Sequence, residues 1–244
     1  MPVEPRPSPV ALVVGGSGAL GGAVCRSLSG DGYAVAVHYS TGSEQADKVC
    51  SDCTTDTMTC TADIARWDEV ETMVGRVTDR LGSIGVLVNT AGVRYDGLLA
   101  TQPRGEWQRT MDVNLLGVFH TCRLVLPDMI ERHWGRIVNV VSPIGLTGNP
   151  GQTAYAASKA GVVALTRSLA LECGRRGITA NAVSPGFMDT AMVSDLSPDT
   201  RKGLIRRSAI RRLIEPQEVA AAVSFVVSNA ALTGAVVPVD GGHA

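Results

Sequence analysis

The sequence has few aromatic residues and almost no net charge. Aromatic side chains make up 4% of its 244 residues, and 22 basic residues nearly balance 23 acidic ones, for a net charge of −1. A chain without a basic excess gives no general reason to expect a nucleic acid or an anionic membrane as a partner. No apolar run reaches the ~18 residues that a membrane-spanning helix needs. We therefore expect no nucleic-acid partner and no membrane span.

A secretory signal and a complete metal site are also missing. The start of the chain has no apolar signal region, so we expect 1–8 to be a flexible leader and 9–244 to form a single domain. The six cysteines are scattered, at Cys25, Cys50, Cys53, Cys60, Cys122 and Cys173. Cys50 and Cys53, with Cys60, have the spacing of half a metal or redox site, but no second pair or nearby histidine completes it. We expect reduced thiols, no metal and a cytoplasmic location.

Short apolar runs rich in β-branched residues alternate with helical stretches along the whole chain. The runs that have the length and composition of buried strands are 9–14, 32–38, 58–62, 84–89, 136–141, 177–183 and 236–240. No linker or internal repeat interrupts the alternation. The pattern predicts a single-domain, doubly wound α/β structure of the Rossmann type, with a seven-stranded parallel sheet flanked by helices.

A glycine-rich loop follows the first predicted strand. It runs from Gly15 to Gly22 and leads into a helical stretch at 23–28. In this context the glycines allow a tight turn, and they let backbone amides approach a pyrophosphate at the helix N-terminus. A glycine-rich turn without a ligand is the alternative. The position at the first strand–helix junction favours dinucleotide binding.

The second predicted strand lacks the acidic residue that grips a ribose 2′-hydroxyl in NAD-binding domains. That acid is expected about 20 residues past the glycines, but Tyr39, Ser40 and Thr41 stand there, and the first acid is Glu44. Its absence argues against NAD and leaves hydroxyls available for a 2′-phosphate. No arginine or lysine occurs in this segment. The sequence therefore favours NADPH, with NADH less favoured.

Ser142, Tyr155 and Lys159 form the pattern around which the chain is organised. Tyr155 and Lys159 are four residues apart, so they share one face of a predicted helix, and Ser142 ends the strand before it. A phenol with an ordinary pKa of ~10 is a poor acid or base at neutral pH, and a nearby ammonium is expected to lower that pKa. Such a trio can protonate a carbonyl oxygen or deprotonate an alcohol. A half-buried tyrosine beside a solvated lysine is the alternative.

Together the motifs resemble the classical short-chain dehydrogenase/reductase family over about residues 10–242. The matching pieces are the glycine loop 15–21, Asp63, 89–92, Asn114, Ser142, Tyr155 with Lys159, Pro185 and Gly186 with Thr190, and 240–242. Each piece is short, but their order and spacing together are specific. Several stretches resemble the 3-oxoacyl-carrier-protein reductase branch of that family: 136–139, 148–152, 155–161, 176–178 and 215–220.

The resemblance implies a role for each matched residue. The catalytic residues would be Tyr155 as the acid/base, Lys159 as its pKa tuner and a ribose ligand, Ser142 at the substrate carbonyl, and Asn114 holding a water. The cofactor would be bound by Gly15, Ser17, Gly18, Leu20, Gly21, Tyr39, Ser40, Thr41, Asp63, Ile64, Asn89, Ala91, Gly92, Tyr155, Lys159, Pro185, Gly186 and Thr190. Among these, Asp63 would contact the adenine, Asn89 would lie near the cofactor, and Thr190 would bond the nicotinamide amide.

The implied activity is NADPH-dependent reduction of a 3-oxoacyl thioester on a carrier protein or coenzyme A. Another small ketone or alcohol, such as a secondary metabolite, a polyketide or a sugar, is the alternative, and a non-catalytic cofactor-binding scaffold is a remote third. The resemblance also implies a homotetramer. An acidic acyl carrier protein would dock near the active-site mouth on Arg176 and on Arg132 or His133.

The chain departs from the family pattern at four places. Val14 stands where the family has a threonine, and Thr90 stands where it has a second asparagine, so we expect weaker hydrogen bonding at these strand ends. Ala19 replaces the middle glycine, and Gly18 replaces the basic residue often found in NADPH users. None of these changes touches the four catalytic positions.

Overall fold

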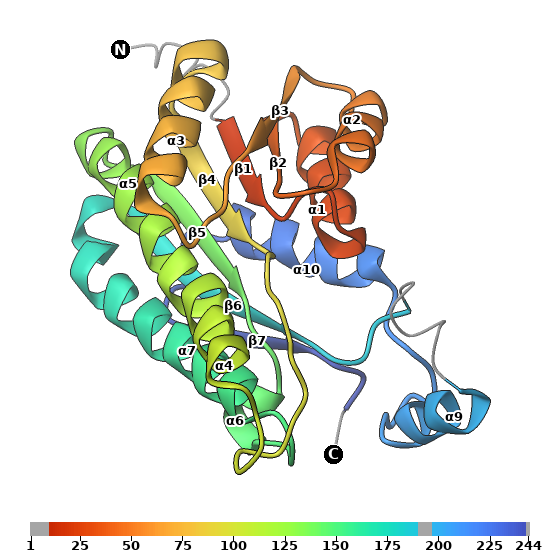
Figure 1. The fold of residues 1–244 in the computed structure, drawn as a ribbon. Coiled ribbons are helices and arrows are strands. Elements are labelled where there is room, and N and C mark those ends of the chain that lie inside the picture. The colour runs from red at the N-terminus through yellow and green to blue at the C-terminus, as the bar shows by residue number, and fades with distance from the viewer. Residues whose placement is uncertain (1–9, 190–196, 243–244) are drawn as a thin grey trace.

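The computed structural model describes residues 10–189 and 197–242. Within these ranges, seven parallel strands form one sheet in the order β3-β2-β1-β4-β5-β6-β7 (Figure 1). The strands are β1 Val10–Val14, β2 Ala34–Tyr39, β3 Thr57–Thr61, β4 Ile84–Asn89, β5 Gly135–Val140, β6 Ile178–Pro185 and β7 Val236–Val239. The predicted fold class is confirmed, whereas the leader at 1–8 and Thr190 lie outside the described residues.

Helices cover both faces of the sheet (Figure 1). One face carries α1 Ala19–Gly30, α2 Ser43–Ser51 and α10 Pro216–Ser228. The other carries α3 Trp67–Leu81, α4 Arg104–Met111, the π-helical turn η1 Asp112–Leu116, α5 Gly117–Glu131 and α7 Thr153–Cys173. The remaining helices are the short α6 Ile144–Thr147 after β5, the short η2 Gly174–Arg176 before β6, and α9 Pro198–Arg206 between β6 and α10.

The sheet is apolar on both faces because it is buried between two hydrophobic cores. Along β1, Val10, Leu12 and Val14 face the core beneath α3, α5 and α7. Ala11 and Val13 face the core beneath α1, α2 and α10. Alternate side chains of a strand point to opposite faces, so a strand covered on both sides must be apolar throughout. This packing fixes the carboxyl ends of the strands as a rigid edge.

Four parts of the chain differ from what the sequence predicts. The sequence predicts one long helix over about 104–132, but the π-helical turn η1 interrupts it, and the short helices α2 and α6 form where no helix is predicted. Helix α1 begins at Ala19 rather than near residue 23, because its first turn consists of the glycine-rich loop residues. In the described chain, the run Arg104–Glu131 is long and apolar enough to cross a bilayer, but half of its most apolar window is buried, as in a core helix.

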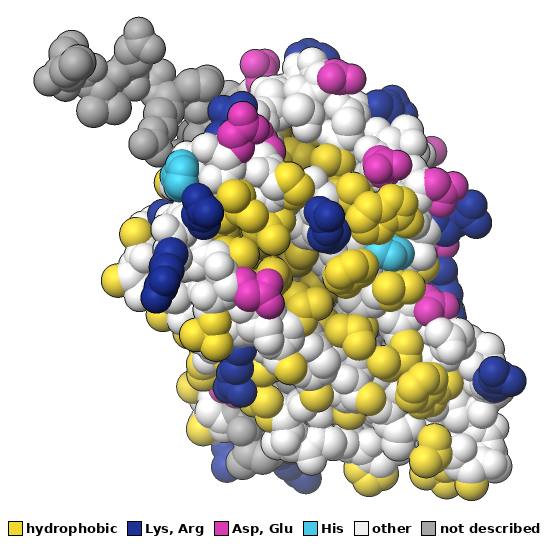
Figure 2. All heavy atoms as spheres, turned by 90° about the vertical axis from the view of Figure 1, so that its left-hand side faces the viewer, with side chains coloured by type: hydrophobic (Ala, Val, Ile, Leu, Met, Phe, Trp, Pro, Cys, Tyr) yellow, Lys and Arg dark blue, Asp and Glu magenta, His cyan; other side chains and the backbone are white. Residues whose placement is uncertain are grey.

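An exposed apolar surface lies on the face formed by α3 and α5. Trp67, Leu116 and Phe119 are exposed there, and the rings of Trp67 and Phe119 are 6.5 Å apart. Figure 2 shows this side of the molecule, with apolar side chains gathered between scattered charges. We call Trp67, Leu116 and Phe119 the α3–α5 patch. Contiguous exposed apolar groups of this kind mark interaction surfaces.

The strand order reverses direction between β1 and β4. Chain segments leaving the carboxyl ends of these neighbours diverge, because β2 lies on the far side of β1 and β5 on the far side of β4. In an open α/β sheet this divergence opens a crevice, and ligands bind in it. The fold therefore places its binding site beside the loop after β1 and the segment after β4.

Candidate active site

A cavity of about 480 Å³ opens at this switch point. Residues expected from the sequence that line it are Gly15, Gly18, Leu20, Gly21, Gly92, Ser142, Tyr155, Lys159, Pro185 and Gly186. Unexpected lining residues are Ala19, Thr90, Val93, Arg94, Val140, Val141, Pro143, Ile144, Phe187 and Met188. The fold thus brings the glycine loop and the serine–tyrosine–lysine trio to one cavity, although more than 120 residues separate them in the chain.

The glycine loop forms a tight cradle at the start of α1. Gly15 has a left-handed φ of +82°, and a Cβ at Gly21 would lie 2.0 Å from the Gly15 carbonyl oxygen. Gly18 caps the helix and donates to the Gly15 carbonyl at 3.1 Å. The first N–H groups of a helix have no partner within it and carry partial positive charge. The residues present therefore fit a pyrophosphate, the central group of a dinucleotide.

Tyr155 and Ser142 place two hydroxyls on the cavity wall. Tyr155 lies in the first turn of α7, Ser142 follows β5, and both residues line the cavity. Burial raises the pKa of Tyr155, and Ser142 and the charge of Arg94 only partly oppose this. The phenol therefore stays protonated at neutral pH in the cofactor-free protein. Burial thus outweighs any lowering by Lys159, and the expected role of Lys159 as the pKa tuner of Tyr155 stays a prediction.

Lys159 is a buried cation beside the same cavity. Its Nζ donates to the Val140 carbonyl at 2.9 Å and lies 5.8 Å from the centre of the Tyr155 ring. Burial lowers the pKa of Lys159 to about 8. Gly92 passes close to it, since a Cβ there would lie 3.6 Å from Nζ. The ammonium is thus held under the cavity floor at neutral pH and loses its charge in mildly alkaline solution.

We expect Lys159→Met to raise the unfolding temperature of the cofactor-free protein at pH 7 by a few degrees. Methionine has a volume similar to that of lysine but carries no charge, and replacing a buried charged side chain by an apolar one of similar volume is often stabilising. The folded pKa of about 8 lies below the ordinary value of 10.5, so the unfolded chain binds the proton more tightly, and the free energy of unfolding should rise between pH 8 and 10.5. The gain from methionine should therefore shrink toward pH 10.

Scanning calorimetry at pH 7 and pH 10 measures this gain directly. Lys202→Met, at an exposed position of α9, is the matched control and should change the unfolding temperature little at either pH. A gain that is absent at pH 7, or that is equal at both pH values, would contradict the burial of a charged Lys159.

Asn114 lies in the π-helical turn η1 and is completely buried. Its Oδ1 accepts from the Val93 N–H at 2.8 Å, and its Nδ2 donates to the Val93 carbonyl at 2.9 Å and to Ser158 Oγ at 3.2 Å. The carboxamide thus holds the segment after β4 against α7. Asparagine is a poor helix former, and these bonds explain why it occurs inside a helix here. Its position in a π-helical turn is typical of functional sites. A role in holding water stays a prediction.

Asn89 is placed inside the protein rather than beside the cavity. Its Nδ2 donates to Asn139 Oδ1 at 2.9 Å, and its Oδ1 accepts from Thr121 Oγ1 at 2.9 Å. The side chain is 2% exposed. The expectation that Asn89 lies near the cofactor is therefore wrong for its side chain, which instead joins β4 to β5 and α5. Ala91 also does not line the cavity, although its neighbours Thr90 and Gly92 do.

The strand ends that carry Val14 and Thr90 are well bonded. The Val14 carbonyl accepts from Thr90 Oγ1 at 2.8 Å, and also from the backbone N–H groups of Thr90 and Ala91 at 2.9 and 3.0 Å. The expected weakening of hydrogen bonding here is wrong. The threonine hydroxyl lost at position 14 is replaced by the one at position 90, which crosses from the neighbouring strand.

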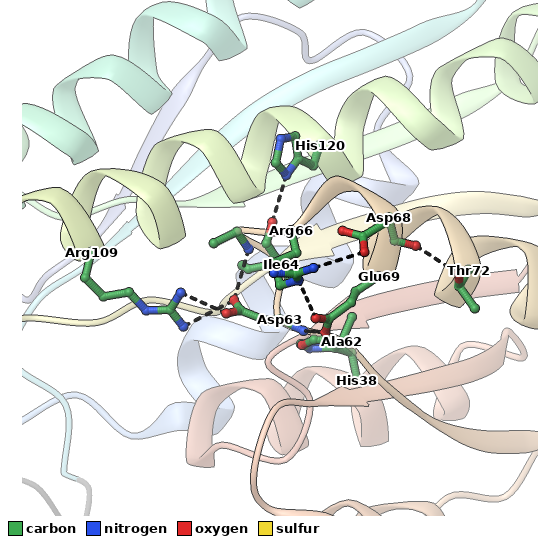
Figure 3. A network of polar contacts seen from close by, with 11 residues as sticks. His38, Ala62, Asp63, Ile64, Arg66, Asp68, Glu69, Thr72, Arg109 and His120 are labelled. Atoms are coloured by element: carbon green, nitrogen blue, oxygen red, sulfur yellow. Dashed lines mark hydrogen bonds and ion pairs between the residues drawn. The ribbon is translucent and has the colours of Figure 1, made fainter.

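Asp63 and Ile64 lie in a polar network at the end of β3 (Figure 3). Arg109 of α4 donates to both carboxylate oxygens of Asp63, at 2.8 and 3.2 Å. Partial burial opposes ionisation, but the bonds and charge of Arg109 lower the pKa of Asp63. Ile64 is buried, and its carbonyl bonds His120 Nδ1 at 2.9 Å. The adenine role of Asp63 stays a prediction, and nothing in the sequence pointed to Arg109 as its partner.

A second cavity of about 330 Å³ lies between α1 and α2, beside Ser17 and Gly18. Arg26 and Lys48 line it, and Arg26 is paired with Asp52 at 3.3 Å. Tyr39, the last residue of β2, is half-buried, and the next two residues, Ser40 and Thr41, are exposed. The segment directly after β2 has no basic residue of its own. The basic side chains beside the glycine loop therefore come from α1 and α2. Sequence reasoning missed Lys48 because it did not predict α2, and it missed Arg26 because this residue lies on α1, far in sequence from the end of β2.

A basic cluster, for which the sequence alone favours a solvated helix face, lies on and after α9: Arg201, Lys202, Arg206, Arg207, Arg211 and Arg212. Arg201 donates to both oxygens of Asp189, at 2.8 and 3.0 Å. Arg212 is paired in the same way with Glu218, at 2.6 Å for both bonds. Arg207 stacks on the ring of Phe187, which lines the cavity. The cluster is thus partly neutralised, and it anchors α9 to the cavity mouth rather than forming a free cationic face.

Arg132 and Arg176 lie at the opposite edge of the sheet from the cavity. Arg132 ends α5 just before β5, and Arg176 ends η2 just before β6. Ser142 lies beyond the other end of β5, about 20 Å away for a strand of this length. The expectation that these arginines flank the mouth of their own active site is wrong, because a parallel sheet separates the amino ends of its strands from the carboxyl ends.

The cysteines are free thiols. Burial raises the pKa of Cys25, Cys50, Cys53 and Cys60, which keeps them protonated at neutral pH. Within residues 10–189 and 197–242, no group of three histidine, cysteine, aspartate or glutamate side chains is arranged to hold a metal ion.

Comparison with known proteins agrees with the geometry. Residues 9–201 match the short chain dehydrogenase family. The 3-oxoacyl-[acyl-carrier-protein] reductase of Staphylococcus epidermidis is 38% identical over 237 residues, which cover 95% of this chain and 97% of that protein. Acetoacetyl-CoA reductase of Allochromatium vinosum is 36% identical, and nodulation protein G of a Rhizobium species is 37% identical, each over 96% of this chain and 96–97% of the relative. The chain is an oxidoreductase that belongs to the short-chain dehydrogenase family.

Proposed function

We propose that the protein reduces a ketone with NADPH. The observation that carries the proposal is one cavity lined by the glycine cradle of α1 and by Tyr155, Ser142 and Lys159. The cradle fits a dinucleotide, and the hydroxyls fit the oxygen of a carbonyl. A non-catalytic scaffold has no need of a buried tyrosine–serine pair beside a buried lysine. Held by the glycine cradle, NADPH would supply the hydride for the carbonyl carbon.

The residues of the chain supply binding and the proton. Ser142 holds the substrate carbonyl oxygen by a hydrogen bond, and Tyr155 donates its phenolic proton to that oxygen as negative charge develops on it. Burial keeps this proton in place at neutral pH because it raises the pKa of Tyr155. Lys159 then stabilises the phenolate that remains, since its ammonium lies under the same ring. Asn114 holds the segment after β4 in place, and we propose that it also orients a water in the proton relay.

For the substrate we propose a 3-oxoacyl thioester, on carrier protein or coenzyme A. The names of two of the relatives describe enzymes for such thioesters. The cavity wall near Tyr155 is largely apolar, with Val93, Ile144, Phe187 and Met188, which suits an acyl chain. A free ketone of another class is the alternative. NADPH absorbance with a panel of 3-oxoacyl thioesters and simple ketones tests the choice, and a preference for the simple ketones would overturn it.

The cations at the mouth of the chain's own cavity are Arg94 and Arg207. Arg94 lines the cavity and is paired with Asp96 at 3.2 Å, and Arg207 stacks on Phe187. We propose that these two attract an acidic carrier or the phosphates of coenzyme A. A docking role for Arg132 and Arg176 then requires that they serve the mouth of a neighbouring subunit, because they lie at the far edge of their own sheet.

We propose NADPH rather than NADH because Lys48 and Arg26 line a cavity beside Ser17 at the glycine loop. Lys48→Ala should raise the dissociation constant for NADPH about fivefold and leave that for NADH unchanged, because an exposed cation contributes about 1 kcal/mol or less. Adding Tyr39→Asp should reverse the preference, by repelling the 2′-phosphate and accepting from a ribose hydroxyl.

Fluorescence titration with each nucleotide measures these constants. Lys202→Ala removes one exposed positive charge elsewhere and should leave both constants unchanged. Equal weakening of NADPH and NADH by Lys48→Ala would show that Lys48 does not recognise the 2′-phosphate.

We also propose a homotetramer in the cytoplasm. The α3–α5 patch supplies one apolar surface on which subunits can meet (Figure 2). The apolar rings of Trp67 and Phe119 lie together on this surface, as in the cores of protein interfaces. Light scattering of the purified protein gives the mass of the assembly directly.

A further inference from the structure

His38 is a buried histidine whose two ring nitrogens are both engaged. It lies one residue before the end of β2 and is 2% exposed. Its Nδ1 lies 3.0 Å from the Gly15 backbone nitrogen, which donates to it. Its Nε2 lies 3.0 Å from the carbonyl oxygen of Ala62, the residue before Asp63 (Figure 3). The ring therefore joins the glycine loop after β1 to the end of β3.

These two partners fix the protonation state of the ring. The Gly15 N–H can only donate, so Nδ1 must be unprotonated, and the Ala62 carbonyl can only accept, so Nε2 must carry the hydrogen. Only the neutral ring with its proton on Nε2 satisfies both. Burial lowers the pKa of His38, with the Ala62 bond and the charge of Asp63 opposing. Protonation would place an N–H group against the Gly15 N–H and break that bond.

The bonded glycine is the one that starts the pyrophosphate cradle. Gly15 lines the main cavity and is confined to a left-handed φ of +82°, with room for no Cβ because Ala91 N would lie 2.7 Å away. The backbone of His38 contributes as well, since its carbonyl accepts from the Ser17 N–H at 3.3 Å. Both ends of the loop's first turn are thus held by one residue of the neighbouring strand.

We propose that His38 is a positioning residue for the dinucleotide: its neutral imidazole holds the glycine loop in the binding conformation, and acid releases it. The inference rests on the proposed dinucleotide function. The charged groups near it are Asp63, paired with Arg109, and Glu69, which bonds the Asp63 N–H and Arg66. The pKa of Asp63 is lowered, so that carboxylate stays ionised while His38 titrates. The neighbour across the sheet, Cys60, has a raised pKa and stays a thiol.

Two substitutions separate the two bonds of the ring. In His38→Asn, Oδ1 is as many bonds from Cα as Nδ1 was, so it can accept from Gly15 and does not titrate. In His38→Gln, the amide reaches toward Ala62 but offers no acceptor at the Nδ1 position. Both variants lose the aromatic ring and its packing. Each therefore controls for the effect of losing the ring in the other.

The test is the affinity for NADP⁺, which is stable in acid, measured by calorimetry on the full chain from pH 7.5 to 4.5, a range that extends well below the ordinary histidine pKa because burial lowers the pKa of His38. At pH 7.5 the His38→Gln variant should bind about 5- to 30-fold more weakly than the unmodified protein, the equivalent of one buried hydrogen bond, and His38→Asn should bind within about threefold. On acidification the unmodified protein should lose affinity more steeply than His38→Asn. Protonation of the 2′-phosphate weakens both alike, so their difference carries the test.

The possible results distinguish failure of the proposed function from failure of the role of His38. No binding by the unmodified protein at pH 7.5 would refute the proposed function itself. Normal binding by His38→Gln, or the same acid loss in His38→Asn as in the unmodified protein, would refute the role of His38 alone. If His38→Gln does not fold, the pH profile of His38→Asn and the ¹⁵N spectrum of the cofactor-free protein still decide: a proton on Nδ1 at pH 7.5 would refute the inference.

Discussion

Tyr155→Phe should lower the turnover number by about 10²–10⁴-fold while NADPH binding changes little. The substitution removes one oxygen, and with it the proton donor, and a general acid contributes about this factor to a rate. The ring itself remains, so the packing of the first turn of α7 and the cation–π contact with Lys159 are kept. Because the lost interaction forms only as the carbonyl oxygen gains charge, kcat should fall much more than KM rises.

Stopped-flow or steady-state NADPH absorbance gives kcat, and fluorescence titration gives the nucleotide affinity. Tyr33→Phe is the matched control, since Tyr33 lies before β2 at the opposite edge of the sheet, and it should keep full activity. Near-normal turnover by Tyr155→Phe would remove Tyr155 from the chemistry. A parallel loss of NADPH affinity would instead indicate damage to the cavity.

Gly21→Ala should disable the cofactor cradle. A Cβ at this position would lie 2.0 Å from the Gly15 carbonyl oxygen and 2.8 Å from the Gly16 Cα, and backbone atoms cannot swing aside as a flexible side chain can. Helix α1 must therefore move away from the loop. Overpacking of this kind costs about 1–3 kcal/mol of unfolding free energy, and we expect a loss of about tenfold or more in nucleotide affinity, each tenfold being ~1.4 kcal/mol.

Gly18→Ala provides the matched control within the same loop. A Cβ there meets only the Gly15 carbonyl oxygen at 3.4 Å, an ordinary contact. Denaturant titration and nucleotide titration of the two variants should therefore show a large loss for Gly21→Ala and a small change for Gly18→Ala. Equal behaviour of the two would mean that the close packing of α1 against Gly15 is not what shapes the cradle.

The sheet could be predicted from the sequence because each buried strand is a continuous apolar run. Val10–Val14 and Ile84–Asn89 must be apolar on both faces between two cores, and this gives a local signal. The segments that form helices α2 and α6 carry no such local signal in the sequence. Helix α2 is short and mostly polar, with only Ala46 and Val49 buried, and α6 is a single turn among glycines and prolines.

The trio of Ser142, Tyr155 and Lys159 could be predicted because it lies within eighteen residues of the sequence, where helix periodicity places side chains reliably. The supporting residues could not. His38 and Arg109 bond Gly15 and Asp63, and Lys48 lines the cavity beside the glycine loop. These neighbours are distant in sequence, and nothing in the local sequence distinguishes the three residues from ordinary strand or surface residues. The direction of the pKa shift of Tyr155 was also beyond sequence reasoning, because it depends on how deeply the fold buries the phenol.

The central claim is that a nicotinamide and a ketone meet in the cavity beside Tyr155. Its most direct test is the fate of deuterium from NADPH labelled separately at each of the two C4 positions, with acetoacetyl-CoA as the substrate and mass spectrometry of the product. We predict one deuterium on the new carbinol carbon from one labelled form only, because a fixed cavity presents one face of the ring. Transfer from neither form would contradict the claim, and equal transfer from both would contradict a single binding geometry.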